Sequence, residues 1–224
     1  MMSGSQMLDQ KKSVLRWGGL AGLLGAFLFL LVMVFVIVFI PPDPTELSGW
    51  VTRFPSIQGG RVVENIIYLL ALLLEIPLFL ALYRSLRKTH LASALFGSTL
   101  AIVGLVAMVV STTPHVAHAT LSRLFHAQAT VAILWQAVRG IFDAMLYVGF
   151  FVIPVGLIIL GKGMFASPSF GKVFSGVIIA LGLIGLTAAI LQMIDPASVT
   201  GVGSYFACLI SYLMMGLKLY KMSK

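Results

Sequence analysis

Residues 17–40 read WGGLAGLLGAFLFLLVMVFVIVFI, a run of 24 residues without a charged side chain. A helix that crosses the hydrocarbon core of a bilayer needs roughly 20 apolar residues. The run is too long for the apolar core of a secretory signal, and no A-x-A cleavage site follows it. It therefore predicts an uncleaved membrane-spanning helix.

The composition extends this prediction to the whole chain. Of its 224 residues, 59% are hydrophobic and 10% are charged, whereas soluble domains are about 25% charged. No polar segment is long enough to fold separately, so we expect one membrane domain over residues 1–224. The predicted fold is all-α, a polytopic bundle of six transmembrane helices. The expected spans are about 17–40, 62–83, 91–112, 138–160, 172–194 and 202–220.

The basic residues sort to the two sides of these spans, and this predicts an orientation. Eleven lie on one side: Lys11, Lys12, Arg16, Arg84, Arg87, Lys88, Lys162, Lys172, Lys218, Lys221 and Lys224. Four lie on the other: Arg53, Arg61, Arg123 and Arg139. Cytoplasmic loops are enriched in Lys and Arg, so we expect both termini in the cytoplasm. The net charge of +8 then favours contact with anionic lipid headgroups and no nucleic-acid partner.

The first outer loop begins with Asp43-Pro44-Thr45-Glu46, which is typical of a helix start. Leu47, Trp50 and Phe54 then follow at helical spacing. The pattern indicates either a short helix in the outer interface or a loop that covers the bundle.

The longest outer segment lies between the third and fourth spans. Pro114 can open a helix, and no further Pro or Gly occurs before residue 138. We expect an amphipathic helix over about 114–137 that runs into the fourth span, with a solvated polar face. The polar face carries His115, His118, Ser122 and His126.

Three histidines on one helical face can ligate zinc or copper. Their spacing matches no known ligand motif and no carboxylate lies nearby, so a solvated face is favoured over a metal site at His115, His118 and His126. No predicted span contains a histidine for haem, and the lone Cys208 excludes a Cys-rich metal site and an internal disulfide. We therefore expect no cofactor.

Small residues recur at four-residue spacing in the first, third and fifth spans. Gly18, Gly22 and Ala26 form one such stripe, and Gly97, Ala101 and Gly104 belong to another. In lipid, small residues allow the backbones of neighbouring helices to approach closely. The pattern predicts tight packing of these helices, in preference to a cavity.

Polar and ionisable residues within the spans are the candidate functional residues, since an intramembrane charge costs roughly 2.5–3.5 kcal/mol on insertion scales. They form one stripe on each of two spans: Glu64, Tyr68 and Glu75 on the second, and Arg139, Asp143 and Tyr147 on the fourth. Arg139 can pair with Asp143 and can reach Glu64.

Two interpretations of these polar residues remain open. In the first, an Arg–carboxylate cluster locks two helices together. In the second, a cleft open to the outside and floored by Glu75 binds a cation, a proton or a polar headgroup. Pro77 follows Glu75 and frees a backbone carbonyl about one turn earlier, which favours a local polar site.

Three stretches resemble a known family. They are the opening RWGGLAGLL at 16–24, the second span with Glu64 and Leu82-Tyr83-Arg84, and residues 149–163 with the short basic loop that follows. The chain resembles domain-of-unknown-function family 4386, uncharacterised prokaryotic multi-pass membrane proteins. The resemblance covers nearly the whole chain in pattern and implies a six-helix membrane fold without an assigned activity.

The sequence contains no phosphate-binding P-loop, no H-E-x-x-H and no G-x-S-x-G motif. We expect a non-enzymatic protein: a binding protein, an accessory subunit or a small transporter-like bundle with an outward-facing polar pocket. The alternative is an intramembrane enzyme that acts on a lipid headgroup. The expected location is a prokaryotic inner or plasma membrane, and the expected partners are the bilayer and either other membrane subunits or further copies of the chain.

Overall fold

The computed structural model describes residues 4–40, 47–112, 114–124, 130–195 and 199–224. Among these residues, six helices are long and apolar enough to cross a membrane, which confirms the predicted all-α fold with six spans. A seventh, short helix lies between the third and fourth spans. The helices are α1 (Gly4–Phe39), α2 (Leu47–Leu86), α3 (Leu91–Val110), α4 (Pro114–Leu124), α5 (Val131–Phe165), α6 (Lys172–Ile194) and α7 (Gly201–Met222).

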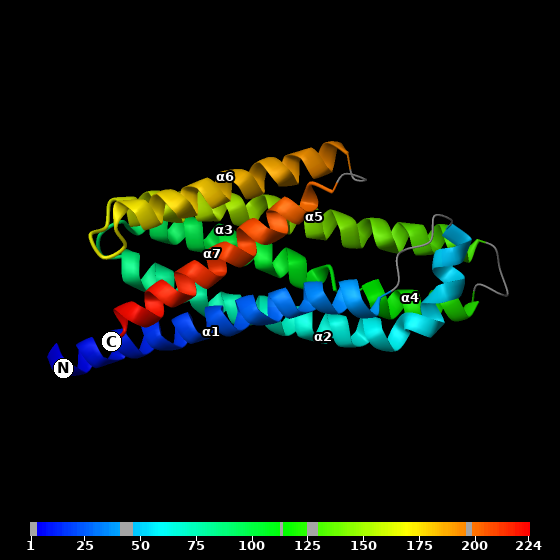
Figure 1. Ribbon diagram of the computed structural model, residues 1–224, viewed down its shortest axis with the longest axis horizontal. Coiled ribbons are helices and arrows are strands. Elements are labelled where there is room, and N and C mark those ends of the chain that lie inside the picture. Colours follow the sequence, from blue (N-terminus) through cyan, green and yellow to red (C-terminus); the bar gives the residue numbers. More distant parts are fainter. Residues whose placement is uncertain (1–3, 41–46, 113, 125–129, 196–198) are drawn as a thin grey trace.

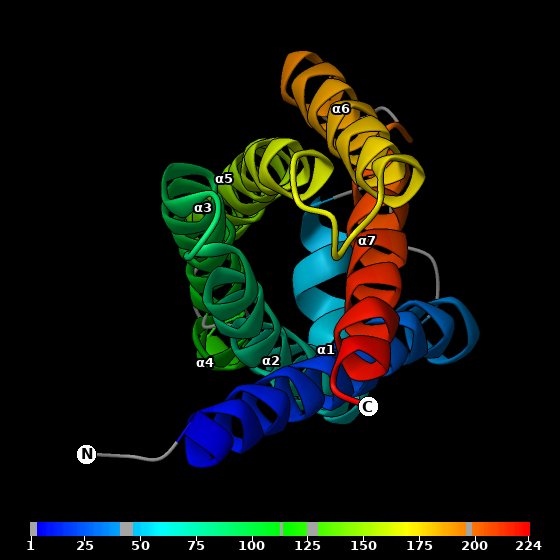
Figure 2. The same cartoon turned by 90° about the vertical axis from the view of Figure 1, so that its left-hand side faces the viewer.

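The six long helices form a ring. Around it α1 packs against α2, α2 against α3, α3 against α5, α5 against α6, α6 against α7, and α7 again against α1 (Figure 2). Successive spans run in opposite directions, so that the start of α1 and the end of α7 lie at the same end of the molecule (Figure 1). The α2–α3 and α5–α6 connections lie there too. The eleven basic residues counted on one side of the predicted spans are therefore gathered at one end of the bundle.

Glycines set the distance between neighbouring helices. A Cβ atom added to Gly156 of α5 would lie 2.7 Å from the Gly97 carbonyl oxygen of α3, and one added to Gly18 of α1 would lie 2.9 Å from the Pro77 oxygen of α2. At Gly182 of α6 it would lie 3.0 Å from a backbone oxygen of α5. These close approaches confirm the tight packing predicted for the first, third and fifth spans.

Large side chains fill the interior of the ring. Two helices, α5 and α7, also make contacts with α2 across it. The interior of the ring is thus a packed core. Its largest fully buried side chains include Phe29, Leu72, Phe79, Ile153, Leu157 and Tyr212.

The predicted continuous helix over 114–137 is wrong. The structure has two helices there: α4 ends at Leu124, and α5 begins at Val131 with Thr130 as its N-cap residue. Both α4 and α5 pack against α2. In addition, α4 packs against α5, and two segments of one straight helix could not pack against each other. No Gly or Pro lies between Leu124 and Val131, which is why the sequence pattern does not reveal two helices.

The expected separation of the first outer helix from the second span is also wrong. One 40-residue helix, α2, contains both segments, with Pro55 inside it. Its first turns bend away from the bundle axis and lie across one end of the ring (Figures 1 and 2). The weak points for such a bend are Pro55 and the glycines at 59 and 60. The predicted cover thus exists as part of α2, and we call the end of the bundle that it covers, opposite the start of α1, the outer end.

An aromatic cluster holds this cover in place. Val51 and Phe54 of α2 pack with Ala119 of α4 and Trp135 of α5. The rings of Phe54 and Trp135 meet edge to face with centroids 5.1 Å apart. We call these four residues, together with His118, the outer aromatic cluster. It joins three helices at the end of the bundle opposite the start of α1.

Candidate functional site

The six predicted polar residues divide into an outer group and a central group. The position of the outer group along the bundle axis follows from the antiparallel packing of α3 and α5. A Cβ at Gly149 of α5 would lie 2.9 Å from the Gly104 oxygen of α3. Val110 ends α3 six residues after Gly104, and Asp143 precedes Gly149 by six residues. Asp143 therefore lies level with the end of α3, and Arg139 lies one turn beyond it.

The outer group consists of two ion pairs. The Arg61 Nη1 and Glu64 Oε2 atoms are 2.8 Å apart, and the Arg139 Nε and Asp143 Oδ2 atoms are 3.6 Å apart. Each pair is formed within one helix. The guanidinium of Arg139 also lies 3.9 Å from the centroid of the Trp50 ring in α2, a cation–π contact. Arg139 thus contacts an aromatic ring of another helix. The sequence had suggested that it could reach the Glu64 carboxylate.

The two outer pairs differ in exposure. The side chains of Arg61 and Glu64 are 17% and 16% exposed, and those of Arg139 and Asp143 are 40% and 32% exposed. Tyr147, one turn further along α5, is half-buried. Partly exposed ion pairs of this kind contribute about 0–1 kcal/mol to stability. The outer group therefore carries charge at little energetic cost.

Glu75 is the central polar residue and is completely buried. Neither of its carboxyl oxygens has a hydrogen-bond partner among the residues that the structure describes. Phe79, one turn further along α2, meets Tyr212 of α7 edge to face with ring centroids 5.9 Å apart. Tyr212 is midway along α7. Glu75 consequently lies about one helical turn from the level of the middle of α7.

The neighbours of Glu75 come from α1 and α7. Its Oε1 atom occupies the place that a Cβ would take at Gly25 of α1, so the glycine makes room for the carboxyl group between two closely packed helices. Cys208 and Tyr212 of α7 belong to the same buried core, and Tyr212 meets Phe79, one turn beyond Glu75 in α2. Nearby in α7, the buried Ser211 hydroxyl also has no hydrogen-bond partner among the described residues.

An aromatic layer lies between the outer group and Glu75. Phe29 of α1 stacks on Tyr68 of α2 with centroids 5.7 Å apart and on Tyr205 of α7 with centroids 4.1 Å apart. The Tyr205 hydroxyl donates a hydrogen bond to the Phe29 carbonyl oxygen. Tyr68 precedes Glu75 by seven residues, which is about 10 Å along the helix. These three side chains therefore pack on one another about two helical turns from Glu75, on the side of the two ion pairs.

The sequence pattern missed the part of the central group that α1 and α7 contribute. Gly25 had been read only as part of an apolar span. In α7, Tyr205, Cys208 and Tyr212 recur at spacings of three and four, which places them on one helical face. That spacing is the signal from which the α7 residues could have been found.

The histidines are placed less completely. His118 is buried, with its ring stacked on Trp135 at a centroid distance of 4.0 Å, and Ser122 is buried as well. The expected solvated face is wrong for these two residues, because α4 packs between α2 and α5. His126 lies outside the described residues, as does the side chain of His115. Within the described part of the chain, no three His, Cys, Asp or Glu residues are grouped as a metal site requires.

Two cavities lie apart from both polar groups. One, of about 380 Å³, lies at the basic end of the bundle between α1 and the end of α7. The other, of about 620 Å³, is lined mainly by apolar residues of α6 and α7, including Leu183, Leu191 and Val202.

Comparisons of the chain with protein-family models, with curated proteins and with solved structures found no match. The chemistry of the site is therefore argued from its own residues. A buried carboxyl group whose oxygens accept no hydrogen bond can hold a proton or contribute oxygen ligands to a cation.

Proposed function

We propose that the chain is a non-enzymatic multi-pass protein of a prokaryotic inner or plasma membrane that binds a proton or a small cation at Glu75. The supporting observation is the complete burial of this carboxyl group within a spanning helix, with both oxygens lacking hydrogen-bond partners among the described residues. An ionised side chain there costs several kcal/mol, so such residues mark ion pathways and proton relays.

The cost of charge also defines the resting state of this site. Without hydrogen bonds to its oxygens, Glu75 is held as the uncharged carboxylic acid. Ionisation then requires either a cation that replaces the proton or water that reaches the carboxyl group. Glu75 would thus exchange one positive charge for another without placing a net charge in the membrane core.

The arrangement of the polar groups supports a small transporter-like bundle. The Arg61–Glu64 and Arg139–Asp143 pairs lie at the outer end, and the aromatic layer of Phe29, Tyr68 and Tyr205 separates that end from Glu75. An ion entering from outside would pass the paired charges and then this layer. In this proposal the aromatic layer must rearrange before Glu75 exchanges its proton.

The orientation proposed for the bundle has both termini in the cytoplasm. It is supported by the basic residues of the α2–α3 and α5–α6 connections, which lie at the same end as the start of α1 and the end of α7 (Figure 1). In this orientation the outer aromatic cluster and the two ion pairs face the outside. Assembly with other membrane subunits, or with further copies of the chain, remains a proposal.

The alternative, an enzyme that acts on a lipid headgroup, would use Arg139 and Asp143 at the outer interface. Arg139 is engaged by Asp143 and by the Trp50 ring, which favours a structural role for this pair. The resemblance to domain-of-unknown-function family 4386 implies a six-helix membrane fold without an assigned activity, so the proposal rests on Glu75.

Infrared spectroscopy of the purified protein in lipid vesicles tests the proton site directly. The wild-type protein should show a carbonyl band of a protonated carboxylic acid at neutral pH, and Glu75→Gln should lack it. Raising the pH, or adding Na⁺ or K⁺, should diminish this band as the proton is lost or replaced. Asp143→Asn is the matched control, because it removes a carboxyl from the outer group.

A second measurement links the site to transport. In vesicles with an imposed pH gradient, the gradient should decay faster with wild-type protein than with Glu75→Gln, while the control variant should behave like wild type. A band that responds neither to pH nor to these cations, together with equal decay rates, would show that Glu75 is a neutral structural group and would refute the proposal.

A further inference from the structure

The cavity at the basic end of the bundle is a second place where polar side chains gather. It measures about 380 Å³ and lies between α1 and the last turn of α7. Its lining comes from two adjacent stripes of α1 and one residue of α7: Asp9, Lys12, Ser13, Arg16, Trp17, Leu20 and Ser223. The cavity is remote from Glu75, so it is independent of the proposed proton site.

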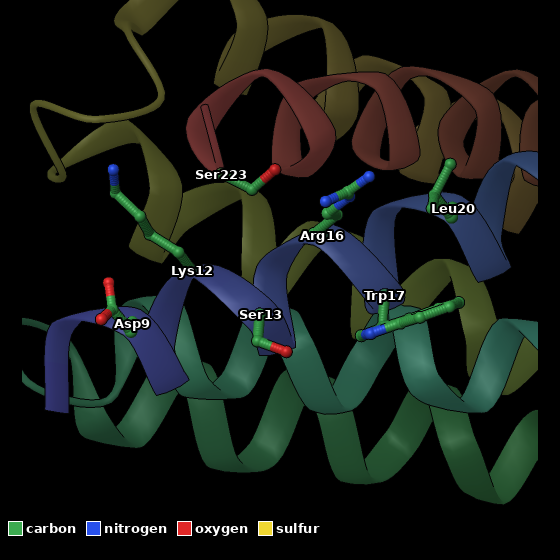
Figure 3. Close-up of a pocket in the computed structure, with 7 residues that line it drawn as sticks. All are labelled: Asp9, Lys12, Ser13, Arg16, Trp17, Leu20 and Ser223. Atoms are coloured by element: carbon green, nitrogen blue, oxygen red, sulfur yellow. The ribbon is translucent and has the colours of Figure 1, made fainter. Parts of the chain in front are cut away.

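Figure 3 shows how these side chains are divided. Lys12, Arg16 and Leu20 project on the side of α1 that faces α7, where Ser223 lies, and Asp9, Ser13 and Trp17 form the neighbouring stripe. The indole of Trp17 extends along the helix toward Leu20. Two cations and one carboxylate line the cavity, so its lining carries one net positive charge.

The same face of α1 continues as an apolar track. Trp17, Leu20, Leu24, Phe27 and Leu31 recur at spacings of three and four residues, and each is exposed on the surface of the bundle. Trp17 is 69% exposed and Phe27 is 60% exposed. These residues belong to the span that covers Lys12–Phe39, so the track faces acyl chains. A polar, positively charged cavity thus opens directly onto a lipid-facing apolar stripe.

Trp17 fixes the level of the cavity in the bilayer. Tryptophan is enriched at the boundary between headgroups and hydrocarbon, and Trp17 separates the charged turns of α1 from its apolar turns. Lys12 and Arg16 therefore lie at the depth of lipid phosphates. Basic cavities between transmembrane helices at this depth suit anionic headgroups.

We propose that this cavity binds one anionic phospholipid. Its phosphodiester is bound by Arg16, whose guanidinium can donate two hydrogen bonds to phosphate oxygens, and Lys12, which also donates a hydrogen bond to the Lys224 main-chain oxygen at 3.5 Å, is the second cation of the lining. The hydroxyls of Ser13 and Ser223 donate to the headgroup, and one acyl chain follows the track from Leu20 to Leu31. One phosphodiester neutralises the net positive charge of the lining. The bound lipid lies beside the place where α1 and α7 already pack closely, with a Cβ at Gly19 falling 2.7 Å from the Tyr220 nitrogen.

Native mass spectrometry of the detergent-solubilised full chain, titrated with phosphatidylglycerol, tests the site. Wild-type protein should retain one phosphatidylglycerol molecule, and phosphatidylcholine should be retained at least tenfold less. Each basic side chain near an anionic surface contributes about fivefold in affinity, so Lys12→Gln with Arg16→Gln should weaken retention by about 25-fold. Both side chains are exposed, so the double variant should keep the wild-type helix content by circular dichroism.

The matched control is Arg87→Gln with Lys88→Gln. It removes the same charge from the same end of the bundle, outside the cavity, and should change retention by less than about twofold. Equal loss in the two double variants would show general attraction to charge and overturn the proposal. Glycerol phosphate is tested in parallel by thermal unfolding. If it stabilises the protein as well as phosphatidylglycerol does, the cavity is a site for small soluble anions and the assignment to a lipid is wrong.

Discussion

The outer ion pairs and Glu75 are both polar groups on the second and fourth spans, but their surroundings are opposite. Arg139 and Asp143 are 40% and 32% exposed and lie 3.6 Å apart, with an aromatic ring beside the guanidinium. Glu75 is completely buried, and its oxygens have no hydrogen-bond partner among the described residues. The outer charges are paired with opposite charges at positions that are partly exposed. The central carboxyl has no hydrogen-bond partner among those residues although it is fully buried, where a partner would stabilise it most.

This difference separates two reasons for placing polar residues in a membrane protein. A partly exposed ion pair costs little and contributes little, so it can serve solubility and local order at the interface. A buried carboxyl without partners is expensive even when uncharged. The comparison therefore assigns the chemical role to Glu75 and a structural role to the outer group, and the following substitutions test this assignment.

The largest effect is expected at the outer aromatic cluster. Trp135 is 2% exposed and contacts both Phe54 and His118, so Trp135→Ala should destabilise the protein by about 3–5 kcal/mol. The loss should be local to the outer end, and amide exchange over residues 49–58 should become faster. Thermal unfolding in micelles and hydrogen exchange measure the two quantities.

Trp135→Phe retains an aromatic ring, so it should destabilise the protein much less than Trp135→Ala does. In both variants the infrared band assigned to Glu75 should remain, because the central group lies in another part of the bundle. Unchanged exchange over residues 49–58 in Trp135→Ala would show that this cluster does not hold the start of α2.

An intermediate effect is expected where α1 meets Glu75. A Cβ at Gly25 would overlap Glu75 Oε1 and lie 3.0 Å from the Ala71 oxygen, so Gly25→Ala should cost about 1–3 kcal/mol through overpacking. Adding Glu75→Ala should recover part of this loss, with a coupling of at least about 0.5 kcal/mol. Thermal unfolding of the four proteins of this cycle gives the coupling.

Gly22→Ala is the control for this cycle. Its added Cβ would meet the flexible Leu78 side chain at 2.8 Å, and its effect should add independently to that of Glu75→Ala. If Gly25 and Glu75 also behaved additively, the carboxyl would not occupy the space beside the glycine.

The smallest effect is expected for the outer ion pair. A double-mutant cycle of Arg139→Gln and Asp143→Asn should give a coupling of about 0.2–1 kcal/mol, because both side chains are partly exposed. Raising the salt concentration from 0.15 to 1 M should weaken this coupling, since exposed charges are screened. The coupling between Gly25 and Glu75 is steric and should not change with salt. A large, salt-independent coupling between Arg139 and Asp143 would instead show that this pair is shielded from water. The outer pair would then resemble Glu75 in its surroundings, contrary to the difference described above.

Much of the fold can be read from the sequence because the bilayer is the solvent. Each span must satisfy its backbone hydrogen bonds internally and must present apolar side chains to lipid. Six apolar stretches therefore predict six helices without any knowledge of their neighbours. The Arg139–Asp143 pair is predictable in the same way, because residues four apart on a helix are adjacent. The basic residues at one end require only a count along the chain.

The errors in prediction lie where one segment depends on another. No Gly or Pro marks the end of α4 at Leu124 or the start of α5 at Val131. The two helices are instead placed by their packing on α2. The burial of His118 depends on Trp135 and Phe54, which lie on other helices. The bend near Pro55 has a visible sequence signal, but the direction of the bent segment is set by the helices that it covers.

The sequence by itself determined that this is a helical membrane protein with six spans, and that Glu75 lies within one of them. Hydropathy and helical spacing are local properties, so they can be read from the sequence without a structure. Only the packing of the helices shows that Gly25 of α1 makes room for the Glu75 carboxyl and that Phe79, one turn further along α2, meets Tyr212 of α7. It also separated the outer charges from that carboxyl. These relations join residues far apart in the chain, and they depend on how closely particular helices can pack.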